Sequence, residues 1–165
     1  MFIYSIVFIM GIFIGSFLNV CIYRIPYNQS IVAPGSHCYN CSTPLKPFDL
    51  IPIISYVFLR GKCRYCGSHI SIRYPMVELL TGIIFLLLFY KYSFSIMYYF
   101  LIALVCILLC IAFIDYDHLI IPDELILFGF VLGLMYKLVL YFFNLQYIKP
   151  IYSLLGILVG GGLFL

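Results

Sequence analysis

The sequence is poor in charged residues and contains no tryptophan. Asp, Glu, Lys and Arg together make up only 9% of its 165 residues, whereas hydrophobic residues make up 65%. A water-soluble domain with so few polar side chains could not cover its own surface, so that class of protein is excluded. The formal net charge of +3 is also too small to indicate a protein that binds nucleic acid. The shortage of charge therefore predicts an integral membrane protein.

Apolar runs take up most of the chain. Four of these runs are long enough to cross the hydrocarbon core of a bilayer, and because no water is present there to satisfy backbone groups, all of the runs should be helical. We expect four complete spans and one that is still apolar at the last residue, at residues 2–23, 76–92, 96–114, 125–143 and 151–165. The predicted fold class is an all-α polytopic membrane protein with about five transmembrane helices. The apolar C-terminus has no polar flank, which predicts that the chain is truncated and its last helix incomplete.

The basic residues favour one orientation in the membrane. Six of the nine lie between residues 24 and 75, at Arg24, Lys46, Arg60, Lys62, Arg64 and Arg73. Loops rich in Lys and Arg usually stay in the cytoplasm. We therefore expect a multi-pass protein of the cytoplasmic (inner) membrane, with residues 24–75 as a cytoplasmic loop and the N-terminus outside.

Two Cys-x-x-Cys pairs lie in this loop. Cys38 and Cys41 form the first pair, Cys63 and Cys66 form the second, and the 21 residues between them are typical of a four-cysteine zinc site. Four thiolates complete a tetrahedron and leave no open position for a water, so the zinc would be structural. Because the cytoplasm keeps thiols reduced, zinc is favoured over disulfides. We predict a zinc-ribbon-like loop.

Two alternatives concern the same cysteines. His37 and His69 adjoin the two pairs and could each replace a thiolate, although four cysteines already suffice. A thioredoxin-like redox pair would need a strand-to-helix context, whereas the prolines and glycines of the loop indicate a turn-rich ribbon.

A second polar segment, residues 115–124, holds four carboxylates and a histidine between the third and fourth spans. Counting spans from an outside N-terminus places it on the same face as the cysteine loop. Asp123 follows Pro122 and suits a helix cap, but Asp115 ends an apolar run, so its carboxylate could face the protein interior and be functional. A carboxylate that cleaves a peptide bond normally needs a second one close by, with which it shares a proton. Asp115 therefore requires a partner.

Together with the two cysteine pairs, several strings of residues closely resemble, in order, those of the type IV prepilin peptidases. They lie at residues 15–26, 49–56, 59–66, 72–78 and 115–123. The resemblance implies a membrane aspartyl endopeptidase that removes the leader of type IV pilin-like precursors at the cytoplasmic face. It also implies an N-methyltransferase that uses S-adenosylmethionine to methylate the new N-terminus. The expected partners are prepilin or pseudopilin precursors and the lipid bilayer.

The resemblance also implies roles for single residues. Asp115 matches the first of the family's two catalytic aspartates, and Asp117, Asp123 and Glu124 could attract a basic leader by their charge. Residues 1–90 would form a methyltransferase-like region, and residues 91–165 the first part of the aspartyl peptidase region. The candidates for a role in methyl transfer are Asn19, Arg24, Gly61, Lys62 and Glu78.

Two of these candidates have alternative interpretations. Glu78 is costly inside an apolar helix unless it pairs with Arg24 or Arg73 or faces a polar pocket, but it could also simply interact with the helix dipole. Asn19 could form an interhelical hydrogen bond rather than belong to a site.

One part of the family's pattern is missing. The second catalytic aspartate belongs to a Gly-x-Gly-Asp motif, and the sequence ends at Gly160-Gly161-Gly162-Leu163-Phe164-Leu165 before any such motif. We therefore expect a fragment that does not cleave leader peptides. Two other functions fit part of the sequence. A non-enzymatic zinc-ribbon membrane adaptor would leave Asp115 unexplained, and a membrane thiol oxidoreductase would need a redox-active pair.

Overall fold

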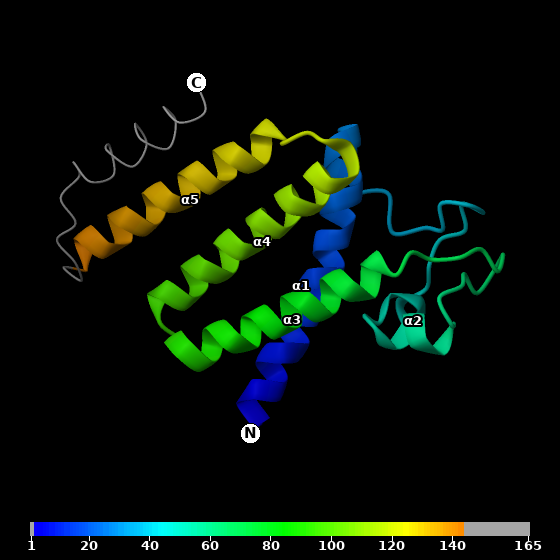
Figure 1. Cartoon of the computed structure of the whole chain (residues 1–165), viewed down its shortest axis with the longest axis horizontal. Helices are drawn as coiled ribbons and strands as arrows, with labels where there is room; N and C mark the ends of the chain where they lie inside the picture. Colours follow the sequence, from blue (N-terminus) through cyan, green and yellow to red (C-terminus); the bar gives the residue numbers. More distant parts are fainter. Residues whose placement is uncertain (1, 144–165) are drawn as a thin grey trace. The chain divides into compact units, whose positions relative to one another are not determined.

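Four long helices account for most of the chain that the structure describes (Figure 1). The structure is a computed structural model and describes residues 2–143. The long helices are α1 (Phe2–Arg24), α3 (Arg73–Tyr92), α4 (Ile96–His118) and α5 (Asp123–Phe142), and residues 2–143 contain no strand. Each is long and apolar enough to cross a membrane, which confirms the predicted fold class and the four complete spans. The expected fifth span lies outside the described residues.

The helices extend beyond the apolar runs that predicted them. α3 begins at Arg73, three residues before the expected start, and α4 continues past Asp115 to His118. α4 ends where Leu119 adopts a left-handed conformation with φ of 55° and donates its N–H to the Asp115 carbonyl. A helix does not have to end where its apolar run ends, because the backbone hydrogen bonds of a helix can also be formed by polar residues that lie in water. Glu78 therefore lies in the second turn of α3, and Asp115 lies in the last turn of α4.

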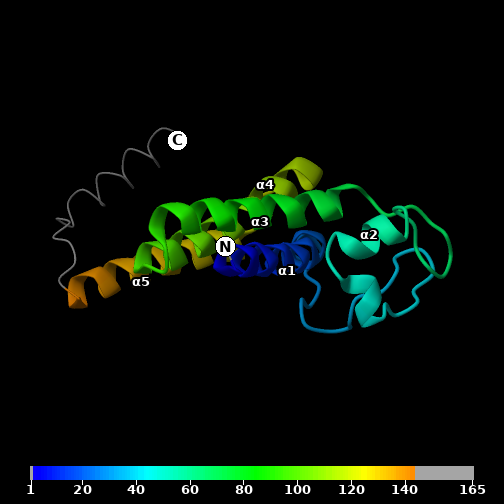
Figure 2. The same cartoon turned by 90° about the horizontal axis from the view of Figure 1, so that it is seen from below.

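The polar loop between α1 and α3 lies beyond one end of these two helices (Figure 2). It contains two short 3-10 helices, η1 (Ile25–Tyr27) and η2 (Pro47–Leu50), and one short α-helix, α2 (Ile54–Phe58). Pro47 suits the first turn of η2, where its missing N–H is not needed.

The chain divides into two compact units, Met1–Gly129 and Phe130–Leu165. The first unit holds α1, the loop, α3, α4 and the start of α5. The described part of the second unit is the remainder of α5. All the candidate site residues of the sequence analysis belong to the first unit.

Helices α1 and α3 approach closely because small residues line their contact. A Cβ atom added to Gly15 would lie 2.7 Å from the Cα atom of Glu78, and one added to Gly11 would lie 2.8 Å from the Cα atom of Gly82. These distances leave no room for a side chain. Gly11 and Gly15 are therefore packing positions. At Gly129, by contrast, the nearest atom to an added Cβ is 4.0 Å away, on Ile107.

Two apolar clusters hold α1, α3 and α4 together. The cluster nearer the loop consists of Leu18, Cys21, Ile22, Val77, Cys110 and Ile114, and the cluster nearer the N-terminus consists of Val7, Phe85, Phe89 and Tyr98. Cys21 and Cys110 are buried in the first of them, so they act as small hydrophobic residues.

The C-terminal end of α4 lies at the same end of the helices as the cysteine loop. Arg73, the first residue of α3, forms an ion pair with Asp117 of α4. The rings of Tyr27 in η1 and His118 in α4 meet edge to face with their centroids 5.4 Å apart. Asp115 therefore lies at the same end of the helices as the loop.

The contact at Gly15 can be tested by substitution. We expect Gly15→Ala to destabilise the chain by about 1–3 kcal/mol, because the new methyl group would meet backbone atoms of α3 that cannot move aside. The measurement is resistance to unfolding by a denaturing detergent. Gly129→Ala is the matched control and should leave the unfolding curve unchanged. An unfolding midpoint for Gly15→Ala equal to that of the unmodified chain would contradict the packing described.

Candidate functional site: a four-cysteine centre and the adjoining pocket

The two cysteine pairs lie on tight turns of the same construction. The Cys38 N–H donates to the Thr43 carbonyl and the Cys38 carbonyl accepts from Ser42. In the second turn, Cys63 forms the equivalent bonds with Ser68 and Gly67. Ser42 and Gly67 occupy the same position and both have positive φ, of 54° and 71°. Each turn is closed by an isolated bridge between backbones, His37 with Pro44 and Lys62 with His69.

These turns bring the four thiols together. The sulfur atoms of Cys38, Cys41, Cys63 and Cys66 all lie within 4.8 Å of one another, and those of Cys38 and Cys66 are 3.8 Å apart. A zinc ion with Zn–S bonds of about 2.3 Å requires sulfur atoms about 3.8 Å apart in a tetrahedron. The donor set and its spacing therefore fit structural zinc, and the prediction that these residues form one cluster is confirmed. Among the described residues, neither His37 nor His69 belongs to the cluster.

Hydrogen bonds favour the thiolate form that zinc needs at two of the four cysteines, Cys66 and Cys38, whereas the pKa of the Cys63 thiol is raised. Bonds from the hydroxyl and the backbone N–H of Ser68 lower the pKa of the Cys66 thiol to about 6. A backbone hydrogen bond from Cys41 lowers the pKa of Cys38. Thiolates rather than thiols coordinate metal, so the site is prepared for a cation.

Asp49 links η2 to the second cysteine turn. Its buried carboxylate accepts hydrogen bonds from Arg64 Nε at 2.6 Å, from the Tyr65 hydroxyl at 3.0 Å and from the Lys46 N–H at 3.2 Å. Burial opposes ionisation of this carboxyl, but the bonds from Arg64 and Tyr65 outweigh it and lower the pKa of Asp49. The sequence analysis gave Asp49 no role of its own.

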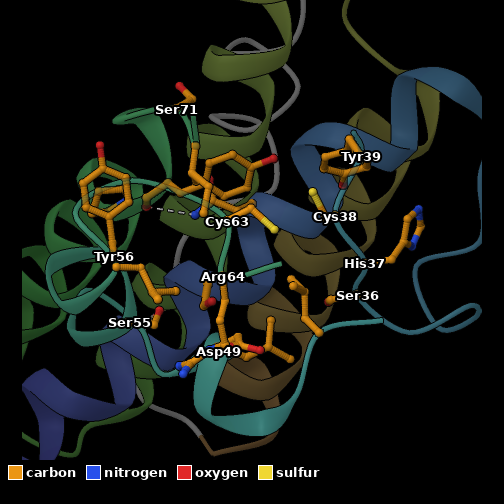
Figure 3. A pocket seen from close by; sticks show the side chains of 18 of the residues that line it. Ser36, His37, Cys38, Tyr39, Asp49, Ser55, Tyr56, Cys63, Arg64 and Ser71 are labelled. Atoms are coloured by element: carbon orange, nitrogen blue, oxygen red, sulfur yellow. Dashed lines mark hydrogen bonds and ion pairs between the residues drawn. The ribbon is translucent and has the colours of Figure 1, made fainter. Parts of the chain in front are cut away.

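A cavity of about 520 Å³ lies between the cysteine turns and the ends of α1 and α3 (Figure 3). Helix α1 contributes Ser16 and Asn19 to its lining, and α3 contributes Tyr74 and Glu78. The loop contributes backbone and side chains that include Ser36, Cys38, Tyr39, Ser55, Tyr56 and Cys63. Its size is that of a small-molecule site, and its lining combines aromatic rings with a few polar groups.

Glu78 is buried in this lining, with 7% of its surface exposed. Its Oε2 accepts a hydrogen bond from the Ile53 N–H at 2.7 Å, and Ser16 is a second hydrogen-bond donor to the carboxylate. Arg24 and Arg73 have other partners, so the suggested ion pair with either one is wrong. The helix dipole acts most strongly in the first turn of a helix. Because α3 begins at Arg73, Glu78 lies beyond that turn. Facing a polar pocket is the alternative that the structure supports.

The backbone that reaches Glu78 is strained. Ile53 has φ of 61° and ψ of −50°, and its neighbours form a three-residue turn in which the Ile54 N–H donates to the Pro52 carbonyl. A positive φ is costly for a β-branched residue. Such turns are rare and persist where surrounding contacts hold them. The strained conformation aims the Ile53 N–H at the carboxylate.

Asn19 serves both as an interhelical link and as part of the lining. Its Nδ2 donates to the Tyr74 carbonyl at 3.0 Å and to the Gly15 carbonyl at 3.3 Å. Its Oδ1 has no hydrogen-bond partner in the described structure, although only 2% of the residue is exposed. A buried acceptor without a donor is costly, and a ligand in the pocket would satisfy it.

Three of the predicted methyl-transfer residues do not line this cavity. Arg24 is buried and donates to the carbonyls of Ser30, Pro34 and Gly35, so it anchors the loop to the end of α1. Gly61 leaves space for the Tyr56 side chain, since a Cβ atom added to Gly61 would lie only 2.9 Å from the Tyr56 hydroxyl. Lys62 is exposed.

The carboxylates of the second polar segment are all on the surface of the described structure. Asp115 is exposed, so the expectation that it faces the protein interior is wrong for the described residues. The buried side of α4 at this level is marked by Ile114, and the next residue in a helix points about 100° away from it. Asp117 pairs with Arg73, whereas Asp123 and Glu124 form the exposed first turn of α5.

Sequence reasoning missed Ser16 and Tyr56. Ser16 could have been found from its spacing, because residues three apart lie on the same face of a helix and Asn19 follows it by three. Tyr56 gave no such signal, since it lies in the loop.

The chain matches the models of two protein families. The model of the bacterial peptidase A24 N-terminal domain matches residues 9–92, and that of the type IV leader peptidase family matches residues 102–165. Proteins described as prepilin leader peptidase/N-methyltransferase are similar to the chain. The protein of Myxococcus xanthus is 42% identical over 77% of this chain and 38% of its own length. The protein of Neisseria gonorrhoeae is 36% identical over 79% and 54%, and that of Klebsiella pneumoniae 33% identical over 94% and 69%.

The chain spans about half the length of the first curated relatives that it matches, between 38% and 54%. No solved structure matches it.

The metal centre can be tested by zinc analysis. We expect one zinc ion per purified chain and no reaction of the four loop thiols with a thiol reagent until the zinc is chelated. Cys66→Ser should weaken zinc retention against a chelator by at least about tenfold, because a serine hydroxyl does not ionise to a ligand. Cys106→Ala, in α4, is the control and should keep its zinc. Four reactive loop thiols in an untreated chain without zinc would exclude this site.

Proposed function

The chain belongs to the type IV leader peptidase family, and we propose that it holds the methyl-transfer pocket of such an enzyme and one carboxylate of its peptidase site. The enzyme would remove the leader of type IV pilin-like precursors at the cytoplasmic membrane face and N-methylate the new N-terminus. The names of the similar proteins support this assignment. Residues 1–90 would form the methyltransferase-like region and residues 91–165 the first part of the peptidase region.

The pocket beside the cysteine centre is the observation that carries the methyl-transfer assignment. Bound S-adenosylmethionine supplies a methyl group on a positively charged sulfur. A buried carboxylate at Glu78 and the rings of Tyr39, Tyr56 and Tyr74 suit a cationic ligand of that kind. The unpartnered Asn19 Oδ1 offers a further acceptor. These features support Glu78 and Asn19 as binding residues, and Tyr56 joins them.

Arg24, Gly61 and Lys62 would act indirectly in this scheme. Arg24 holds the loop against α1 through three backbone carbonyls, and Gly61 leaves space for Tyr56. The zinc would fix the two cysteine turns that form one wall of the pocket. It would be structural, because four thiolates leave no position open for chemistry.

For leader cleavage, we propose Asp115 as one of two catalytic aspartates. The chain has six acidic residues, and none follows Glu124. Among the carboxylates near Asp115, the charge of Asp117 is opposed by Arg73, so attraction of a basic leader would rest mainly on Asp123 and Glu124. The Gly-x-Gly-Asp motif that holds the family's second aspartate does not occur in these 165 residues.

Binding of the methyl donor provides the first test. We expect the 165-residue chain in detergent to bind S-adenosylmethionine, and Tyr56→Ala to weaken this binding about tenfold through loss of a ring beside the cation. Tyr90→Ala is the matched control, because Tyr90 is exposed on α3 and outside the pocket. Zinc content monitors folding. Equal affinities of the unmodified chain and Tyr56→Ala for S-adenosylmethionine would show that this pocket is not the binding site of the methyl donor.

The peptidase assignment makes a separate prediction. We expect these 165 residues alone to show no leader cleavage, because a single carboxylate cannot share a proton with a partner and activate a water. The assay uses a pilin-like precursor in detergent. Cleavage that Asp115→Asn abolishes would refute this expectation and would require a second carboxylate within the chain.

A further inference from the structure

An open apolar groove adjoins the pocket on the outer face of α1. It has a volume of about 410 Å³ and is lined by Phe13, Ser16, Phe17, Val20, Ser36, Pro47, Leu50 and Ile51. Ser16, Val20, Ser36 and Leu50 line the pocket as well, so the groove and the pocket share a wall. Phe13 and Phe17 are 56% and 49% exposed on a helix that crosses the membrane. The groove therefore opens towards the bilayer.

The polarity changes from the groove to the pocket. Phe13, Phe17, Val20 and Pro47 are apolar and would contact hydrocarbon favourably. Beyond the shared wall, the pocket is lined by Glu78, whose carboxylate is buried, and by Asn19, whose Oδ1 is buried without a hydrogen-bond partner in the described structure. Both groups accept hydrogen bonds, and one carries a negative charge. A molecule that fits both parts has an apolar body and a cationic hydrogen-bond donor at one end.

We propose that this groove is the route by which an apolar helical peptide enters from the bilayer, so that its free N-terminal ammonium group reaches Glu78 and Asn19. The ammonium group has three donors, enough to bind the carboxylate and Asn19 Oδ1 together. Ser16 lies at the junction and belongs to both linings. This inference rests on the proposed function, because the methyl acceptor there is the new N-terminus of a membrane-embedded helix.

A cationic lipid headgroup would share the ammonium chemistry, but the peptide fits better for a physical reason. An apolar helix is a rigid body, and Phe13 and Phe17, one turn apart on α1, offer it two exposed rings on one face to pack against. The peptide is the occupant to which we commit, and the lipid is an outcome that the test can reveal.

The experiment uses site-specific photo-crosslinking in the full 165-residue chain. A benzophenone amino acid replaces Phe17 in the groove or, as a control, Leu108, which is 53% exposed on α4. Each chain is placed in phosphatidylcholine nanodiscs with an apolar helical peptide of about 20 residues, long enough to cross the bilayer. The peptide carries either a free or an acetylated N-terminus.

We expect at least about tenfold more labelling by the free-amine peptide at position 17 than at position 108, and loss of this excess on acetylation. Glu78→Gln should also reduce labelling at position 17, although its side-chain carbonyl can still accept the Ile53 N–H and preserve the fold. Zinc content confirms that each variant is folded.

Several results would overturn the proposal. The first is equal labelling at positions 17 and 108, and the second is labelling at position 17 that acetylation of the peptide does not change. The third is loss of peptide labelling when phosphatidylethanolamine is added, and this third result would assign the groove to a lipid. The binding of S-adenosylmethionine is measured separately on the same chains. If that binding depends on Tyr56 but position 17 gives no excess labelling, the route is wrong while the pocket assignment stands. Excess labelling without binding of the methyl donor would support the docking groove and reject the pocket's proposed role.

Discussion

The close approach of α1 and α3 at Gly15 determines the geometry of the candidate site. Because Gly15 has no side chain, the backbone of α3 at Glu78 can lie directly against α1. This contact brings Asn19, one turn further along α1, to the Tyr74 carbonyl, and Ser16 to the Glu78 carboxylate. A larger residue at position 15 would separate the two helices and with them the polar groups that each contributes to the pocket. The geometry of the pocket at the loop end therefore depends on the packing of α1 against α3 in the membrane part.

The few charged groups of this apolar chain are used to attach the loop to the helices. The guanidinium of Arg24 binds three backbone carbonyls of the loop, and Asp49 joins η2 to the second cysteine turn through Arg64. Arg73 connects the start of α3 to the end of α4 through Asp117. A buried charge is costly unless partners surround it, so the buried groups among them, Arg24 and the carboxylate of Asp49, each stabilise only one arrangement of their neighbours. Glu78 differs from them, since it is held by backbone and hydroxyl donors and not by a cation in the described structure.

Apolar length and cysteine spacing were enough to predict the four described spans and the four-cysteine cluster, because both depend on local patterns. The partners of Glu78 and Arg24 could not be predicted in this way. Charge alone suggested that the two would pair, but Arg24 is occupied by carbonyls from residues 30–35, and Glu78 is reached by the N–H of Ile53. Backbone groups carry no sequence signature, so contacts to them become visible only in three dimensions. The exposure of Asp115 could not be predicted either, because the end of an apolar run does not show which way the next side chain of a continuing helix points.

The strained turn at Ile53 gives a reason for the loop's dependence on Glu78. A positive φ at a β-branched residue costs on the order of 1–3 kcal/mol, and it persists only where other contacts outweigh it. Here the hydrogen bond from the Ile53 N–H to a carboxylate, 2.7 Å long and charge-assisted, is a contact strong enough to do so. The dependence is mutual, because the carboxylate is buried and needs that donor as much as the turn needs the acceptor. One link between helix α3 and the loop therefore passes through Glu78, which also faces the pocket, and a ligand that draws hydrogen bonding away from Glu78 would weaken the contact that holds the turn.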